Sequence, residues 1–215
     1  DVPPQTVDSE YLAELIVRAE AVRPRFQAAV HRTLVTAELT DMAQVYFGAL
    51  KRPARIAQKA AEKYGGDYSR VCDLVRMTIV CDSVEVVTQT FVAIARADGL
   101  RVERVKNRLH PSFVATESAG YRDVLLNVRD VPTQHVCEIQ LTLRRFHDIK
   151  TQGGHAMYKV LRLVGRLEDW YRAHQGDAAD EVAAARLADG AVSELDVTGS
   201  DADAVTCNVI PAISS

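Results

Sequence analysis

Residues 73–105 read DLVRMTIVCDSVEVVTQTFVAIARADGLRVERV, and this stretch decides the fold class. Its first part, Leu74–Cys81, is apolar and rich in β-branched residues, as is typical of a buried strand. Asp82-Ser83 is suited to cap a helix, and apolar side chains then recur at helical spacing over 84–97. Leu100–Val105 alternates apolar and polar residues as a second strand. The stretch therefore predicts a βαβ-like unit in the middle of the chain.

Three helices are predicted before this unit. Ser9 is suited to cap the first helix, and Pro24 stands where a second helix can start, with helical propensity over 25–47. Pro53 marks the first turn of a third helix, which runs to Lys63 because Gly65-Gly66 follows.

Two strands and further helices are predicted after the unit. Val124–Val128 and Val136–Leu141 form a hairpin, and a helix follows from about 143 to 173. An Ala-rich stretch at 178–188 favours a last helix. The predicted fold class is α+β, with a mixed β-sheet of about four to five strands flanked by helices.

Composition indicates one globular domain with a tail. The chain has 215 residues, of which 47% are hydrophobic and 26% charged. We expect a disordered lead-in over 1–8, one domain over 9–175, and an acidic tail over 176–215 that is disordered from about Gly190. Apolar runs are too short for a membrane-spanning helix, and no signal peptide is visible. A cytoplasmic site of action is predicted. The four cysteines form no Cys-x-x-Cys pair, which argues against zinc and redox motifs.

The charge distribution favours an anionic ligand for the middle of the chain. The net charge is −3, which argues against general nucleic-acid binding. Residues 51–110, however, hold twelve Lys/Arg and seven Asp/Glu, whereas residues 176–215 hold one Arg and eight Asp/Glu. Solvated helix faces would explain the same asymmetry, and that alternative stays open.

Candidate phosphate-binding groups precede the first strand. Lys51, Arg55 and Lys59 follow one another at i, i+4 and i+8, a spacing that puts them on one helix face, where a polyphosphate would offset their repulsion. Asp73 stands just before the strand, a position suited to magnesium, and Arg76 within the strand needs an anionic partner if it is buried. The alternatives are a plain surface stripe and a turn aspartate.

Further candidates lie on the later strands. Glu138 and Gln140 share one strand face, opposite Cys137 and Ile139, and therefore form a ligand-facing pair. Arg104, Lys106 and Arg108 alternate and point to one side, where they could line an anion-binding cleft. Each of these groups would also be compatible with simple exposure to solvent.

Two short fragments complete the set. Gly120-Tyr121 places an aromatic ring at a loop edge, where it could stack on a base. His155-Ala156-Met157-Tyr158-Lys159 begins a helix after two glycines. An ordinary turn and an ordinary helix start are the alternatives.

In this order, the segments resemble the synthetase domain of the RelA/SpoT family, whose members make the alarmone (p)ppGpp and its relatives. The resemblance covers roughly residues 45–165. Glu138-Ile139-Gln140 is similar to that family's Glu-[Val/Ile]-Gln signature, and His155–Lys159 is similar to its His-Trp-x-Tyr-Lys. The resemblance implies a nucleotidyltransferase-like synthetase fold.

The same resemblance implies a reaction and its participants. ATP would donate its β,γ-pyrophosphate to the ribose 3′-hydroxyl of a purine nucleotide, with Mg²⁺ as cofactor. Asp73 and Glu138 would be the catalytic and metal-binding carboxylates, and Tyr121 would stack on the acceptor base. The residues assigned to the ATP phosphates are Lys51, Arg52, Arg55, Lys59 and Arg76, and those assigned to the acceptor, besides Tyr121, are Lys106, Arg108, Gln140 and His155.

Two departures from the family pattern concern specificity. Where the family reads x-Ser-Leu-His after Gly-Tyr, this chain has Arg122-Asp123-Val124-Leu125, so Leu125 replaces the histidine. Thr78 stands where the family has an arginine, for which Arg76 is a substitute from another position. We therefore expect (p)ppApp- or (p)ppGpp-type products, with adenine nucleotides as the first choice of acceptor.

Alternative functions stay open at this stage. One is a toxin that pyrophosphorylates the 3′ end of tRNA, and another is an inactive nucleotide-binding module. A toxin-type domain would be delivered as part of a larger protein and would have an immunity protein as a partner. No membrane partner is expected.

Overall fold

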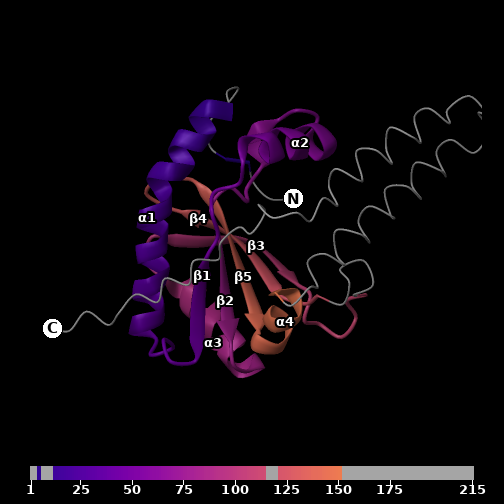
Figure 1. Ribbon diagram of the computed structural model, residues 1–215. Helices are drawn as coiled ribbons and strands as arrows, with labels where there is room; N and C mark the ends of the chain where they lie inside the picture. Colours follow the sequence, from indigo (N-terminus) through magenta and orange to yellow (C-terminus); the bar gives the residue numbers. More distant parts are fainter. Residues whose placement is uncertain (1–3, 6–11, 115–120, 152–215) are drawn as a thin grey trace, which may run out of the picture.

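The computed structural model describes residues 4–5, 12–114 and 121–151 (Figure 1). The segments predicted beyond residue 151, including the end of the long helix, the Ala-rich helix and the acidic tail, lie outside the described residues. Among the described residues, no helix is long and apolar enough to cross a membrane.

A mixed sheet of five strands forms the centre of the fold, in the order β1-β2-β5-β4-β3. β2 pairs with β5 in parallel, and the other neighbouring strands pair antiparallel. The predicted α+β class is confirmed. The strands are β1 (Ala43–Phe47), β2 (Arg76–Cys81), β3 (Leu100–Asn107), β4 (Val124–Asp130) and β5 (Val136–Leu143).

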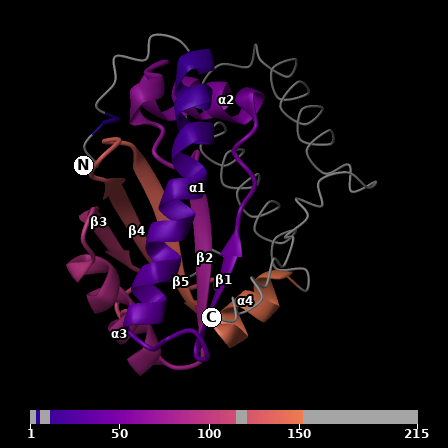
Figure 2. The same cartoon turned by 90° about the vertical axis from the view of Figure 1, so that its left-hand side faces the viewer.

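Two helices, α1 (Leu12–Thr36) and α3 (Val84–Arg96), cover one face of the sheet (Figures 1 and 2). Ser83 caps α3 as predicted, because its side chain accepts a hydrogen bond from the Val86 N–H. The core between helices and sheet contains Phe26 of α1, Ile94 of α3 and the inward side chains of the strands. The polar side chains of the central strands therefore lie on the opposite face of the sheet.

Three short elements lie at the ends of the sheet. They are α2 (Pro53–Tyr64), a 3₁₀ turn η1 (Tyr68–Arg70) and α4 (Arg144–Ile149). α2 begins at Pro53 and is followed by Gly65, whose φ of 62° is left-handed and ends the helix, as the sequence predicts. In both views α2 and α4 lie toward opposite ends of the sheet (Figures 1 and 2).

The structure differs from the sequence prediction over residues 12–47. One helix, α1, runs through Pro24, where a second helix was expected to start. Its buried side chains recur at helical spacing on both sides of the proline, so packing against the sheet outweighs the missing hydrogen bond. The predicted helix over 25–47 is wrong at its end, because Ala43–Phe47 forms the edge strand β1. β-branched and aromatic residues there favour a strand once β2 offers an edge.

The predicted βαβ-like unit is present, but its strands are not neighbours. β2 is parallel to β5, while β5 and β3 are both antiparallel to β4, so β3 runs parallel to β2. The hairpin β4–β5, which was also predicted, fills the space between them. The chain thus places a late strand, β5, in the middle of the sheet.

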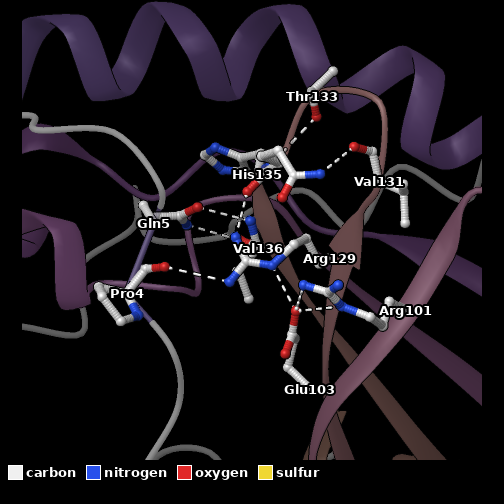
Figure 3. Close-up of polar contacts among 10 residues, drawn as sticks. Pro4, Gln5, Arg101, Glu103, Arg129, Val131, Thr133, His135 and Val136 are labelled. Atoms are coloured by element: carbon white, nitrogen blue, oxygen red, sulfur yellow. Dashed lines mark hydrogen bonds and ion pairs between the residues drawn. The ribbon is translucent and has the colours of Figure 1, made fainter.

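The N-terminal segment is fastened to β5 through Gln5 (Figure 3). The Gln5 side chain donates to the Val136 carbonyl at 2.9 Å and accepts from the Val136 N–H at 2.7 Å. The Gln5 N–H also donates to the Ser69 carbonyl at 2.9 Å. Of the lead-in predicted over residues 1–8, the structure describes residues 4 and 5, and Gln5 is buried.

A buried arginine joins this segment to the end of the sheet (Figure 3). Arg129 is 2% exposed, and its Nε lies 2.6 Å from Oε1 of Glu103. Its guanidinium also donates to the carbonyls of Gln134 and Pro4. Because a buried charge is costly without partners, these contacts fix the turn between β4 and β5.

His135 lies buried in the same turn and is 4% exposed (Figure 3). Its Nε2 has no hydrogen-bond partner among the described residues. Burial lowers the pKa of His135 from 6.5 to about 4, against the opposing charge of Asp130. The folded protein therefore holds this imidazole neutral at pH values where the unfolded chain protonates it.

We predict a loss of stability on mild acidification that comes from His135. The penalty begins as pH falls below the unfolded pKa of 6.5 and is complete below a folded pKa of about 4. Between pH 7.5 and 5 it should reach about 2 kcal/mol. Urea unfolding of wild type and of His135→Asn at both pH values measures it. An equal pH dependence in the two proteins would show that His135 is protonated in the fold.

Candidate functional site

The polar face of the sheet, opposite α1 and α3, carries the candidate residues in two rows. One row runs across the strands through Arg76, Glu138, Asn127 and Arg104, which are paired in register from β2 to β3. The next row contains, in strand order, Tyr46, Thr78, Gln140, Leu125 and Lys106. Residues far apart in the sequence thus come together because the strands alternate their side chains between two faces.

Asp73 stands before β2 at the α2 end of the sheet and is held by two lysines. Its Oδ2 lies 2.5 Å from Nζ of Lys51 and 2.9 Å from Nζ of Lys59. All three side chains are largely buried. A carboxylate before a strand and cations from the α2 segment therefore form one cluster, as the sequence suggests.

The prediction that Lys51, Arg55 and Lys59 share one helix face is wrong for Lys51. α2 begins at Pro53, so Lys51 lies before the helix and reaches Asp73 from the preceding loop. Lys59 reaches the same carboxylate from the helix itself. Arg55 lies one helical turn before Lys59, is exposed and donates to Gln58 at 2.7 Å, and Arg52 is exposed at the N-cap.

Burial and the neighbouring charges shift the pKa values of Asp73, Lys51 and Lys59 to different extents and in different directions. Burial opposes ionisation of Asp73, but Lys59 and Lys51 outweigh it and hold the pKa of Asp73 below its ordinary value. Burial lowers the pKa of Lys51 despite Asp73. The pKa of Lys59 is raised, because Asp73 and more distant groups, including Glu138, outweigh its burial.

Glu138 lies next to this cluster in the central strand β5. Its N–H donates to the Val75 carbonyl at 2.9 Å, and its Oε1 accepts from Nε2 of Gln140 at 2.9 Å. The predicted sharing of a face by Glu138 and Gln140 is thus confirmed. Burial and the charge of Asp73 raise the pKa of Glu138, with Lys59 opposing. Two neighbouring carboxylates therefore have pKa values displaced in opposite directions, which is common where protons are moved.

Asp73 and Glu138 fit a divalent cation that also contacts phosphate. Oδ1 of Asp73 is buried and has no hydrogen-bond partner among the described residues. Mg²⁺ is held in proteins by one or two carboxylates together with substrate phosphates. Within the described ranges no group of three or more His, Cys, Asp and Glu side chains could hold a metal by itself. The donor set therefore suits a metal that is completed by a nucleotide.

Gly48, which follows β1, leaves room for the side chain of Arg76. A Cβ built on Gly48 would lie 3.0 Å from Cγ and 3.3 Å from Nε of Arg76. The glycine thus lets the arginine side chain lie directly against the backbone. Arg76 and Thr78 share the polar face, so a guanidinium at 76 is on the correct side of the sheet to substitute for one at 78. Gly48 carries no motif, and sequence reasoning missed it.

The other end of the polar face contains Tyr121 and Lys150, near α4. Nζ of Lys150 lies 4.8 Å from the centre of the Tyr121 ring and donates to Oε1 of Gln140 at 3.3 Å. Burial raises the pKa of Tyr121 and lowers that of Lys150. Lys150 was not predicted as a site residue, because one lysine at a helix end carries no sequence signal.

The remaining predicted cations lie in different surroundings. Arg108 forms an ion pair with the fully buried Asp123, so its charge is largely neutralised. Lys106 is exposed on β3, in the row of Gln140. His155 lies outside the described residues. Sequence reasoning also missed a stack between Tyr46 and His147, whose ring centres are 4.6 Å apart.

Comparison with solved structures shows similarity to two crystal structures of the Bacillus subtilis small alarmone synthetase 1. One, bound to its product pppGpp, aligns at 15% identity with a TM-score of 0.51 over 87% of this chain and 94% of the other. The second aligns at 14% identity with a TM-score of 0.51 over 85% and 91%. The chain has the fold of a small alarmone synthetase. The resemblance drawn from the sequence is thereby confirmed at the level of the fold.

A further solved structure aligns less closely, and two other comparisons found no match. The type VI effector Tas1, in complex with its immunity protein, aligns at 18% identity with a TM-score of 0.48 over 86% of this chain and 94% of the other. No protein-family profile matches the chain. No curated protein matches it either.

We predict that Lys59 stabilises the fold through Asp73. Lys59→Met should lower the free energy of unfolding by about 1–2 kcal/mol, because a largely buried carboxylate loses a partner. In an Asp73→Asn background the same change should cost clearly less, since only the more distant Glu138 carboxylate then loses the charge of Lys59. Urea unfolding at pH 7.5 measures both steps.

The matched control is Lys63→Met, which removes an exposed lysine from the last turn of the same helix. It should change stability by no more than about 0.5 kcal/mol. An equal loss for Lys59→Met with and without Asp73 would contradict the pairing.

Proposed function

We propose that the chain is an ATP-dependent nucleotide 3′-pyrophosphokinase. The observation that carries this proposal is the pair Asp73 and Glu138, with displaced pKa values and flanking lysines, on the polar face of a sheet with a synthetase fold. Its fold neighbour from Bacillus subtilis was crystallised with the product pppGpp. Transfer of pyrophosphate between nucleotides uses metal-binding carboxylates, phosphate-binding cations and a proton acceptor, and the site contains all three.

In the proposed reaction the ribose 3′-hydroxyl oxygen of the acceptor attacks the β-phosphorus of ATP. A bond forms between that oxygen and the β-phosphorus, and the bond from the β-phosphorus to the α,β-bridging oxygen breaks, so AMP leaves. Glu138 takes the hydroxyl proton. Its raised pKa suits that role, because a base works best with a pKa close to the working pH.

Donor binding is assigned to the α2 end of the polar face. Lys51 and Lys59 would contact the phosphates of ATP, and Arg76 extends the positive charge along β2. Arg52 and Arg55 would add charge at the exposed rim of the same end. Asp73 and Glu138 would hold Mg²⁺, which when bound neutralises charge on the phosphates. Positioning and charge neutralisation then account for most of the catalysis.

Acceptor binding is assigned to the α4 end. Tyr121 would stack on the purine, Gln140 and His155 would contribute polar contacts, and Lys106 and Arg108 would contribute charge. Leu125 lies between Gln140 and Lys106 in register, and its aliphatic side chain has no hydrogen-bonding group. A guanine-specific hydrogen bond from this position is therefore absent, which supports (p)ppApp- as well as (p)ppGpp-type products.

The proposed site of action is the cytoplasm, where ATP and acceptor nucleotides are available. Expression in a host cell separates an alarmone enzyme from a toxin. A toxin should stop growth unless a specific immunity protein is produced with it.

We predict that Glu138→Gln abolishes transfer while the protein stays folded. Activity should fall at least about a hundredfold, the scale of one acid–base group. The melting temperature should stay equal or rise, because the raised pKa of Glu138 shows that its charge is unfavourable in the fold. Product chromatography and thermal unfolding measure the two effects.

The control is Glu62→Gln, which makes the same chemical change at an exposed position on α2. Its activity should equal that of wild type. Activity of Glu138→Gln close to wild type would remove Glu138 from the reaction.

We predict that Tyr121 acts on the acceptor and not on ATP. Tyr121→Ala should raise the KM of the acceptor about tenfold or more, the scale of one lost base stack, and leave the KM of ATP nearly unchanged. Tyr121→Phe keeps the ring and should behave like wild type. AMP and GDP are the varied acceptors in steady-state kinetics, and a rise in the KM of ATP alone would contradict the assignment.

A further inference from the structure

Lys150 follows α4 and contacts two of the residues proposed to bind the acceptor, Tyr121 and Gln140. Its ammonium lies over the ring of Tyr121, with 4.8 Å between Nζ and the ring centre. The same Nζ donates to Oε1 of Gln140 at 3.3 Å. The ammonium therefore occupies one face of the ring on which a base would stack.

This half-buried cation has no ion pair among the described residues. Burial lowers the pKa of Lys150. The charges of Asp123 and Glu138 raise it, and those of Arg76 and Arg108 lower it. Asp123 forms its ion pair with Arg108, and Glu138 accepts a hydrogen bond from Gln140. Lys150 is thus held by a neutral amide and an aromatic ring, both weaker partners than an anion.

The described cations at the acceptor end differ in how they are engaged. Arg108 pairs with the buried Asp123, and Lys106 is exposed on β3. Lys150 has a flexible four-carbon side chain with a compact charge, which can turn away from the ring without a change in backbone. It is therefore placed to supply a further charge beside the stacking ring.

We propose that Lys150 changes partners when the acceptor binds: the base takes its place on the Tyr121 ring, and the ammonium pairs with the acceptor's 5′-phosphate. This inference rests on the proposed function and deepens it. The nucleotide-free site is then covered by its own lysine. An acceptor without a 5′-phosphate has to displace the ammonium from the ring and cannot form an ion pair with it.

Opposite effects on nucleosides and nucleotides follow from this exchange. Without Lys150 the ammonium no longer occupies the ring face, so a nucleoside should bind equally well or more tightly. A nucleotide loses a charge-assisted contact and should bind more weakly. A purely structural role for Lys150 would weaken both ligands to the same extent.

Isothermal titration calorimetry tests the proposal, with the donor site saturated by α,β-methylene ATP. The titrants are guanosine, GMP and GDP, and in parallel adenosine, AMP and ADP. For Lys150→Met we expect at least about tenfold weaker binding of the better diphosphate and no loss for its nucleoside. Lys150→Arg keeps the charge and should retain most of the affinity for the diphosphate.

The control is Lys63→Met, an equal charge removal on the exposed end of α2, which should leave all the titrations unchanged. Equal weakening of nucleoside and diphosphate by Lys150→Met would overturn the exchange, as would an unchanged affinity for both. Wild-type protein that binds nucleotides in the expected pattern but forms no transfer product would refute the proposed function and leave the role of Lys150 intact.

Discussion

Parallel pairing of β2 with β5 is the constraint on which the candidate site depends. It sets Glu138 beside Arg76, and the Glu138 N–H donates to the Val75 carbonyl, two residues after Asp73. Two carboxylates that are 65 positions apart in the sequence thereby come close enough for the charge of one to raise the pKa of the other. The fold accommodates that repulsion by directing Lys51 and Lys59 at Asp73. A ligand that brings Mg²⁺ and phosphates would satisfy the same carboxylates and release the lysines.

The arrangement of the sheet divides the polar face into two ends. Asp73 and its lysines lie at the α2 end, whereas Tyr121 and Lys150 lie near α4. Glu138 and Gln140 belong to the strand between them and are joined by a hydrogen bond. A donor at one end and an acceptor at the other would therefore meet at Glu138. Arg129, which pairs with Glu103, and Gln5, which bonds to Val136, hold the β4–β5 turn in place.

Much of this arrangement could be predicted from the sequence, because the relevant patterns are local. The strand after Asp73, the capped helix α3 and the Glu138–Gln140 face follow from periodicity of two or 3.6 residues. β1 could not be predicted in that way, since its five residues form a strand only against the edge of β2. Lys150 and Gly48 were missed for a similar reason. Their roles come from what the fold places beside them, a ring in one case and an arginine side chain in the other.

Pyrophosphate, and not a nucleotidyl group, is the group proposed to be transferred at Glu138. The most direct measurement incubates the protein and Mg²⁺ with ATP labelled with ³²P at either the α- or the γ-phosphorus, together with GDP, GTP, ADP, AMP or tRNA. Chromatography then follows the label. Label from the γ-position should appear in a new purine nucleotide while label from the α-position is recovered as AMP. Label from the α-position in the acceptor product, or release of γ-label only as inorganic phosphate, would contradict the account.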